Sequence, residues 1–562
     1  MAMTLPSEIL FMVLDNLGEE RDYNSLFQCA LASKLFTEHA LSVLYRIYDA
    51  SPLRGGGTED EQFKRKPVFA SAASKGDRSS TLRKWITLWR SILLSTLEVT
   101  YLPYYSYIRY LDLDDLGNLL GSGPTVKDEL ITQELLEFVS NEYISEGNKR
   151  RRSARTLPDN DWIKVKLGSA IVQRNSLIRG MSCDVPPATL NQWIESSPQL
   201  QTLSVWSGSV FSQHAGEKIR VHCPDFKQLR IYIWQNKAPG NSERDAETDA
   251  EELFNTLRPN SLEYFEVLSF SHLGPRSIKA LGTQKDSLME LKLTSLDINT
   301  IRELPSLTAL PRLEVLTLTD SAPTAWDEQF HTTVGEISEW LQSCTKLKRL
   351  ELRKFLDDTE LLTKVLTTSD IHLTTLSFSG CKLSATRGFL DVLASHTSLQ
   401  TLYLRGEGSE NPNDNANLVQ ALTSLSDLRD LELKDVSDFF TMDNVLTLTP
   451  FLPQLERLWI SGEAYNDSLW DAFLCCPNLK SLAIYALSNF TAAGVIEFIS
   501  RLGPANKGMN LSILNAVCAA SFPYETQVLI REFLEEGFKG SFDFGLAQEE
   551  FSDASSDIEL SD

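Results

Sequence analysis

A hydrophobic pattern of the form Leu-x-x-Leu-x-Leu recurs along most of the chain. Copies such as CTKLKRLEL, HTSLQTLYL, LSDLRDLEL and LPQLERLWI differ mainly at the positions between the leucines. Successive copies lie 24 to 36 residues apart, and their first apolar positions are Leu200, Phe226, Leu262, Leu288, Leu313, Leu347, Leu373, Leu399, Leu428, Leu455 and Leu479. A repeat of this length predicts stacked copies of one supersecondary unit, each with a short strand.

The segments between the copies have a different periodicity. EISEWLQSC, TELLTKVLTT and SLWDAFLCC carry apolar residues three and four positions apart, which predicts a helix after the strand. One strand and one helix cannot bury both of their apolar faces alone, so neighbouring copies must stack. The two longest steps are explained by loop insertions at 235–252 and 321–330.

The period and the strand pattern together resemble the leucine-rich repeat, which repeats every 20–29 residues or so. The resemblance implies an α/β fold in which strand-plus-helix repeats form a curved, horseshoe-shaped solenoid. We expect this solenoid over 81–520, with clear repeats over 198–486 and degenerate copies at both ends.

The composition changes on both sides of the expected solenoid. Residues 49–80 are rich in Gly, Ser and charge, which predicts a flexible linker. A helical pattern over 521–540 predicts a C-terminal cap. No basic residue follows Lys539, so residues 541–562 are expected to be a disordered acidic tail.

The charge of the chain limits the classes of partner. Asp and Glu number 76 against 53 Lys and Arg, giving a net charge of −23, which argues against nucleic acid as the main partner. No apolar run is long enough to span a membrane, and Glu8 and Asp15 interrupt the first one, unlike a signal peptide. We therefore expect a cytoplasmic or nuclear protein. The basic run at 148–155 fits either a nuclear address or a solvated loop.

The eight cysteines do not indicate a disulfide framework or a metal site. No CxxC pair occurs, and no Cys/His group has zinc-binding spacing, so we expect no cofactor. Cys223, Cys344 and Cys476 each stand three residues before the first apolar position of a repeat, which favours a structural role. GxSxG, GxxxxGK and HExxH motifs are missing as well, so the sequence favours a non-catalytic protein.

The chain begins with a short, strongly apolar segment, LPSEILFMVLDNL. On a helix, Ile9, Leu10, Val13, Leu14 and Leu17 make one apolar face, with Phe11 and Met12 off that face. SLFQCALAS and HALSVLYRIY predict a second and a third helix. A unit of some forty residues is too small to be stable without further burial, so a partner is expected to cover part of it.

Residues 5–46 resemble the F-box as it occurs in fungal proteins, and we place this domain at 3–48. The resemblance departs from the common form in the longer GEERDYN connection and in Phe36, where many members have Trp. It implies docking on a Skp-type adaptor, and through the adaptor on a cullin and a RING protein. The residues that the resemblance assigns to adaptor binding are Leu5, Pro6, Glu8, Ile9, Leu10, Val13, Leu14, Leu26, Cys29, Ser33, Lys34 and Phe36.

An F-box ahead of leucine-rich repeats implies the substrate-recognition subunit of a ubiquitin ligase, with the protein substrate on the repeats. The alternative is a non-degradative leucine-rich-repeat scaffold with an F-box-like start. Neither interpretation identifies the substrate or the process.

Alternation along each strand points the leucines inward and the intervening side chains to the concave face. Trp, Tyr and Arg at those positions are the residue types that dominate binding hot spots. The expected substrate-binding residues are Trp206, Arg230, Tyr232, Tyr264, Arg349, Arg353, Tyr403, Arg405, Arg457, Trp459 and Tyr485. Arg353 and Arg405 flank a row of hydroxyl residues, a pattern that would suit an anionic side chain. The simpler alternative is that exposed strand positions tolerate any residue.

Overall fold

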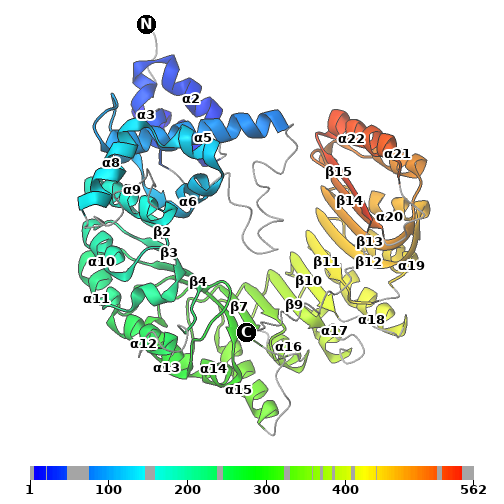
Figure 1. The fold of residues 1–562 in the computed structure, drawn as a ribbon. Coiled ribbons are helices and arrows are strands. Elements are labelled where there is room, and N and C mark those ends of the chain that lie inside the picture. The colour runs from blue at the N-terminus through cyan, green and yellow to red at the C-terminus, as the bar shows by residue number, and fades with distance from the viewer. Residues whose placement is uncertain are drawn as a thin grey trace, which may run out of the picture. The chain divides into compact units, whose positions relative to one another are not determined.

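The computed structural model describes residues 6–19, 22–46, 75–145, 159–236, 245–321, 329–356, 359–367, 371–381, 387–406, 412–437, 440–515 and 522–546. The described residues belong to two compact units, Met1–Glu290 and Leu291–Asp562. Both units are built from strands and helices in alternation (Figure 1). The basic run at 148–155 lies outside the described residues.

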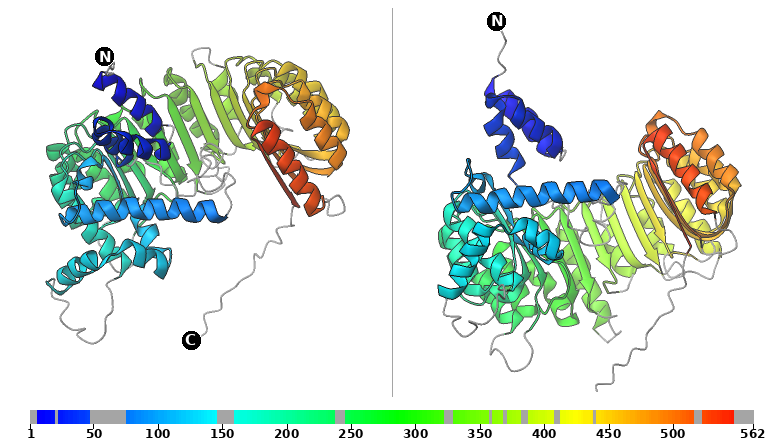
Figure 2. Two further views of the ribbon diagram at one scale, coloured as in Figure 1. Left: turned by 90° about the horizontal axis from the view of Figure 1, so that it is seen from above. Right: turned by 45° about the horizontal axis from the view of Figure 1, so that its top comes forward.

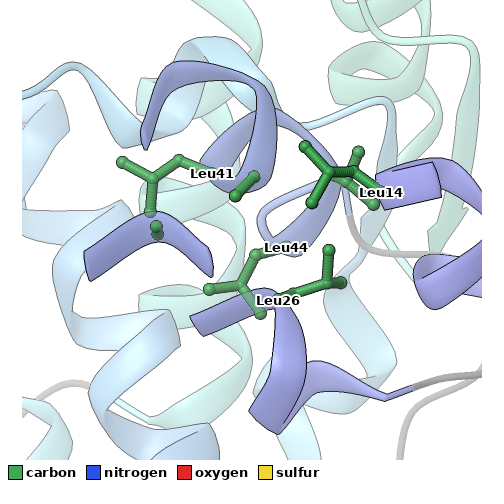
Figure 3. Packing of buried hydrophobic residues seen from close by; sticks show 7 residues of the cluster. Leu14, Leu26, Leu41 and Leu44 are labelled. Atoms are coloured by element: carbon green, nitrogen blue, oxygen red, sulfur yellow. The ribbon is translucent and has the colours of Figure 1, made fainter. Parts of the chain in front are cut away.

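The first unit begins with three helices, α1 Ser7–Glu19, α2 Tyr23–Ala32 and α3 Lys34–Leu44. Their apolar stripes meet in a small core, in which Figure 3 shows Leu14, Leu26, Leu41 and Leu44. Side-chain oxygens cap the N-termini of two of the helices. The Asp22 carboxylate accepts the Ser25 N–H, and the Ser33 hydroxyl accepts the Leu35 N–H. The expectation of an N-terminal three-helix unit is confirmed.

Helix α5, Lys75–Thr96, follows the three-helix unit and begins inside the segment that we expected to be a linker. Residues 49–74, the rest of the expected linker, lie outside the described residues. The reason for the earlier start of α5 is packing. Trp85, Ile86, Trp89 and Ile92 are buried along one side of α5, and the helix extends from this packed part toward its N-terminus. Figure 2 shows α5 as a long blue helix next to the three-helix unit.

The remainder of the first unit consists of parallel strands joined by helices. The strands lie in chain order, each paired with the next. The elements are β1 Tyr110–Asp112, α6 Leu113–Gly121, α7 Pro124–Leu130, α8 Gln133–Ser145, α9 Asn160–Arg174, β2 Gly180–Cys183, α10 Pro187–Ser196, β3 Thr202–Ser207, α11 Ala215–His222, β4 Gln228–Ile233, α12 Ala246–Thr256, β5 Tyr264–Val267 and α13 Pro275–Leu281.

The second unit repeats the same arrangement, and its strands from β7 to β15 are parallel and paired in chain order. Its elements are β6 Glu290–Leu296 (whose first residue belongs to the first unit), α14 Ile298–Glu303, β7 Val315–Asp320, α15 Phe330–Ser343, β8 Arg349–Arg353, α16 Thr359–Leu366, β9 Thr375–Cys381, α17 Arg387–Leu393, β10 Thr401–Gly406, α18 Pro412–Thr423, β11 Asp430–Lys434, α19 Met442–Leu448, β12 Arg457–Asn466, α20 Trp470–Leu474, β13 Ser481–Asn489, α21 Ala492–Ser500, β14 Asn510–Asn515, α22 Tyr524–Phe538 and β15 Ser541–Leu546.

The leucines of the repeated pattern stack in register across the strands. Leu350 pairs with Leu376, which pairs in turn with Leu402 on the next strand. All three are fully buried, and the residues between them are more exposed on most strands, as on β8. This strand-plus-helix architecture confirms the leucine-rich-repeat fold class.

The buried cysteines of the repeats agree with the sequence patterns, and the two expected insertions differ from them. Cys223, Cys344 and Cys476 are buried, with each Sγ 3.5–3.8 Å from a backbone carbonyl oxygen. The insertion expected at 235–252 ends in the first turns of α12, and the last residue of the one expected at 321–330 begins α15.

The C-terminal end differs from the expectation of a cap followed by a tail. Helix α22 is followed by a further strand, β15, which pairs in parallel with β14 and begins at the position expected for the disordered tail. The sequence SFDFGL alternates, and its phenylalanines pack on Phe522, with ring centroids 6.4 Å apart for Phe542 and 4.8 Å for Phe544. An acidic tail therefore begins no earlier than residue 547, which lies outside the described residues.

Within the part of the chain that the structure describes, no helix has both the length and the apolar character needed to cross a bilayer.

Candidate functional site

The side chains expected to bind an adaptor separate into a buried and an exposed group. Leu10, Leu14 and Leu26 are buried, and the last two belong to the core of the three-helix unit. This corrects the expectation that they contact a partner, because a side chain with almost no accessible surface has none left to bury in an interface. Leu5 lies outside the described residues.

The remaining expected residues are accessible. Cys29 and Phe36 are half-buried, and the exposed ones are Pro6, Glu8, Ile9, Val13, Ser33 and Lys34. Only Ile9 and Val13 among these exposed residues are large and apolar, and their i, i+4 spacing places them on one face of α1.

Further exposed apolar side chains lie on all three helices. Met12 of α1, Phe27 and Leu31 of α2, and Leu35 of α3 each keep about half or more of their surface. We call these four residues, with Ile9 and Val13, the exposed apolar set. Sequence reasoning missed Phe27, Leu31 and Leu35, because the sequence places Phe27 and Leu31 directly after the buried Leu26 and Ala30 and does not show which of the two pairs is exposed.

Phe11 does not belong to this set, although the sequence placed it with Met12. Its ring makes an edge contact with His39, at 5.7 Å between centroids, and the Arg46 guanidinium lies 5.8 Å from its centroid. Arg46 also forms an ion pair with Asp15 at 2.6 Å. Phe11 thus fastens α1 to the end of α3.

The three-helix unit is joined to the first repeat by backbone hydrogen bonds. The Arg46 carbonyl accepts the N–H groups of Arg109, at 3.0 Å, and of Tyr110, at 3.2 Å. The Arg109 carbonyl accepts those of Arg179 and Gly180 in the same way. The end of α3 therefore occupies the place that a preceding repeat would occupy.

Side chains reinforce this junction. The Tyr45 ring stacks on Tyr104, with centroids 4.6 Å apart, and its hydroxyl lies 2.9 Å from that of Ser91 on α5. Leu88, Leu102 and Tyr107 also pack against the core of the three-helix unit. The three-helix unit therefore packs against the first repeat and is not a separate body on a linker.

On the strands of the first unit, the predicted binding residues lie side by side. Trp206 and Tyr232 stack with centroids 4.2 Å apart and an interplanar angle of 18°, and both rings are exposed. Next to them, the Arg230 guanidinium binds the Glu266 carboxylate at 2.7 Å, and the Tyr264 hydroxyl donates to the same carboxylate. Burial, followed by the nearby Glu266 charge, raises the pKa of Tyr264 above its usual value.

On the strands of the second unit, each predicted arginine lies against a carboxylate. Arg349 and Arg353 flank Glu351, at 3.4 and 3.2 Å, and Arg405 binds Glu432 at 2.7 Å. The hydroxyl residues between them are largely buried in the case of Thr375 and Ser377. Each arginine of this row is therefore held by a carboxylate of the strands, Glu351 or Glu432, an arrangement that the sequence pattern did not reveal.

The neighbouring strands continue this arrangement. The Tyr403 hydroxyl donates to Asp430 at 2.6 Å, and Arg457 binds the same carboxylate at 2.5 Å. Burial and the Asp430 charge raise the pKa of Tyr403, so its hydroxyl remains a donor.

Trp459 and Tyr485 stack at 6.4 Å between centroids with an angle of 16°, and the Lys434 ammonium lies 5.8 Å from the Trp459 centroid. All the predicted concave-face residues are thus on strands, but in two groups on two units.

No family model and no curated protein matches this chain. Among solved structures it is similar to a chain from the yeast Rad7–Elc1 complex, with 14% identity and a TM-score of 0.39 over 74% of this chain and 94% of that one. It is also similar to a chain from a TLR13–ssRNA13 complex, with 14% identity and a TM-score of 0.34 over 60% and 49% of the two chains.

An internalin from Listeria monocytogenes is a third similar structure, with 14% identity and a TM-score of 0.29 over 55% of this chain and 84% of that one.

In the described ranges, no three His, Cys, Asp or Glu side chains come together as possible ligands of a metal ion. The surfaces above offer stacked rings, paired charges and exposed apolar groups, which are the means of protein recognition.

Proposed function

We propose that this chain is the substrate-recognition subunit of a Skp–cullin–F-box ubiquitin ligase and has no catalytic activity itself. In this proposal, the exposed apolar set docks on the Skp-type adaptor, and the strand faces of the repeats bind a protein substrate. The adaptor would link the chain to the cullin and the RING protein.

The exposed apolar set is the observation that carries the proposal. Six large apolar side chains on three short helices keep about half of their surface, although other apolar residues of the same helices are fully buried. Exposed apolar side chains in such number favour a protein interface. The F-box resemblance of residues 5–46 supplies the identity of the partner.

The first experiment is co-purification of the full chain with a Skp-type adaptor. We expect Val13→Asp combined with Leu31→Asp to abolish the complex, because each change places a charge in an apolar interface. Tyr101→Asp is the matched control, since Tyr101 is the most exposed large apolar residue outside the set in the described part of the chain. Both proteins should keep the same unfolding midpoint in urea.

The proposal is wrong if the intact chain does not bind the adaptor. It is also wrong if the double variant binds the adaptor as well as Tyr101→Asp does. Point variants are preferable to removal of the first fifty residues, because that removal also takes away the Arg46 carbonyl that pairs with Arg109 and Tyr110.

The alternative is a non-degradative scaffold that uses the same repeats to hold a partner. Stacked Trp206 and Tyr232 serve either function equally well. Mass spectrometry of proteins captured by the full chain and by the Val13→Asp/Leu31→Asp variant separates the two. A cullin captured by the full chain and lost from the variant favours the ligase, and its lack in both favours the scaffold.

A further inference from the structure

The strands β8 to β12 present more cationic than anionic side chains on the face opposite their leucines. The described side chains of β9 on this face are the small hydroxyl groups of Thr375, Ser377 and Ser379. Among the described side chains of these strands, the charged ones on this face are five cations and three carboxylates, namely Arg349, Arg353, Arg405, Lys434 and Arg457 with Glu351, Asp430 and Glu432. A net positive face is unexpected in a chain with a charge of −23.

The carboxylates lie deeper than the arginines that they bind. The Arg457 side chain is 45% exposed and its Asp430 partner 9%. Arg405 is 22% exposed against 11% for Glu432, and Arg349 is 31% exposed against 14% for Glu351. A partner approaching this face therefore meets guanidinium groups first.

The buried carboxylates also orient the arginines before any partner arrives. A guanidinium held by an ion pair has already lost rotamer freedom, so it loses less on binding a ligand. Its five N–H donors lie in one plane and match a carboxylate bidentately. This arrangement suits recognition of carboxylates on a ligand better than a set of mobile lysines would.

An aromatic pair continues the same face. Trp459 and Tyr485 stack beside Lys434 on adjacent strands. Both rings are half-buried, which leaves surface for an apolar side chain of a ligand. Cationic and aromatic groups together fit a segment that carries acidic residues next to an apolar one.

We propose that the β8–β12 face, with Trp459 and Tyr485 at its border, binds an acidic segment of the partner protein. This proposal deepens the function proposed above and rests on its claim that the repeats hold a protein. Nucleic acid fits less well, because a duplex carries one charge per about 1.7 Å and would be repelled by the acidic remainder of the chain.

Fluorescence anisotropy of the full chain tests this assignment. The probe is a fluorescein-labelled peptide of alternating glutamate and serine with one central phenylalanine, and its glutamine-for-glutamate version is the neutral control. We expect the acidic probe to bind and the neutral control not to bind. The affinity for the acidic probe should fall as the salt concentration is raised.

Arg457→Gln should weaken that binding by about tenfold, the effect of losing one charge-assisted hydrogen-bonded contact. Arg501→Gln is the matched control, since Arg501 is 50% exposed and binds Asp471 at 2.7 Å, but lies directly after helix α21 and not on a strand. It should leave the affinity unchanged.

Four results would overturn the assignment. The first three are no binding of the acidic probe, an equal loss of affinity in Arg457→Gln and Arg501→Gln, and tighter binding of a single-stranded oligothymidylate, which would mean a nucleic-acid face. A fourth is tighter probe binding after removal of residues 547–562, which would mean that the acidic end of this chain occupies the face. Adaptor co-purification is a separate readout, and we expect Arg457→Gln to leave it unchanged.

Discussion

At the scale of single residues, the strand faces depend on arginines held by partly buried carboxylates. Arg230 with Glu266 in the first unit and Arg405 with Glu432 in the second have the same geometry, at 2.7 Å in each pair. Removing one of these carboxylates would leave its arginine without the group that orients it. The arginines therefore serve recognition only together with their carboxylates.

Buried cysteines are a second feature at this scale, and their chemistry can be predicted. Burial raises the pKa of Cys223 and of Cys476 to about 12, so both remain neutral thiols near pH 8. The thiolate is the reactive form, and Cys475 is exposed next to the buried Cys476.

We expect iodoacetamide at pH 8 to modify Cys475 in the native protein and to leave Cys476 unmodified. Tandem mass spectrometry of the peptide that contains both residues measures the two sites separately. In urea both should react, because unfolding removes the burial that protects Cys476. Modification of Cys476 under native conditions would show that α20 and the strand after it open readily.

At the scale of elements, one carboxylate joins helix α5 to the first repeat. Asp115 on α6 is fully buried and accepts the indole N–H groups of Trp85, at 2.6 Å, and Trp89, at 2.7 Å. Both tryptophans lie on the buried side of α5. This interaction fixes the rotation of α5 about its own axis.

Asp115→Ala should lower the free energy of unfolding by about 3 kcal/mol, because two buried indole donors lose a charged acceptor. Urea unfolding followed by tryptophan fluorescence measures the loss. Asp161→Ala is the control, since its carboxylate is 88% exposed and its ion pair with Lys164 should contribute less than about 1 kcal/mol. Equal effects of the two changes would refute the role of Asp115.

At the scale of the whole molecule, the three-helix unit and the first repeats share packing and hydrogen bonds. The Arg46 carbonyl accepts the backbone N–H groups of Arg109 and Tyr110, the Tyr45 ring stacks on Tyr104, and Leu102 packs against the core of the three helices. In a ligase, such a junction would fix the orientation of the first repeats relative to the adaptor.

Hydrogen exchange should reveal this coupling. A chain lacking residues 1–46 should exchange faster over 102–120, where the contacts of Tyr104 and Tyr110 are lost, and at an unchanged rate over 202–233. Mass spectrometry of peptic fragments measures both regions in one experiment. Unchanged exchange over 102–120 would mean that the three helices are an independent domain.

Local patterns in the sequence determined much of this protein. The spacing of the leucines predicted the strands and the stacking of repeats, because alternation and helical periodicity depend only on neighbours in the chain. The three N-terminal helices and the strand positions of Trp206, Arg230, Tyr403 and Trp459 followed from the same patterns.

Only the tertiary structure decided the contacts between segments far apart in sequence. It placed Leu10, Leu14 and Leu26 inside and Phe27 and Leu31 outside, added β15 to the repeats, and set Arg46 against Arg109. It also paired arginines with carboxylates, some of them about one repeat away, as in Arg405 and Glu432. Such pairs depend on the register between neighbouring strands and on which faces meet, and a local pattern contains neither.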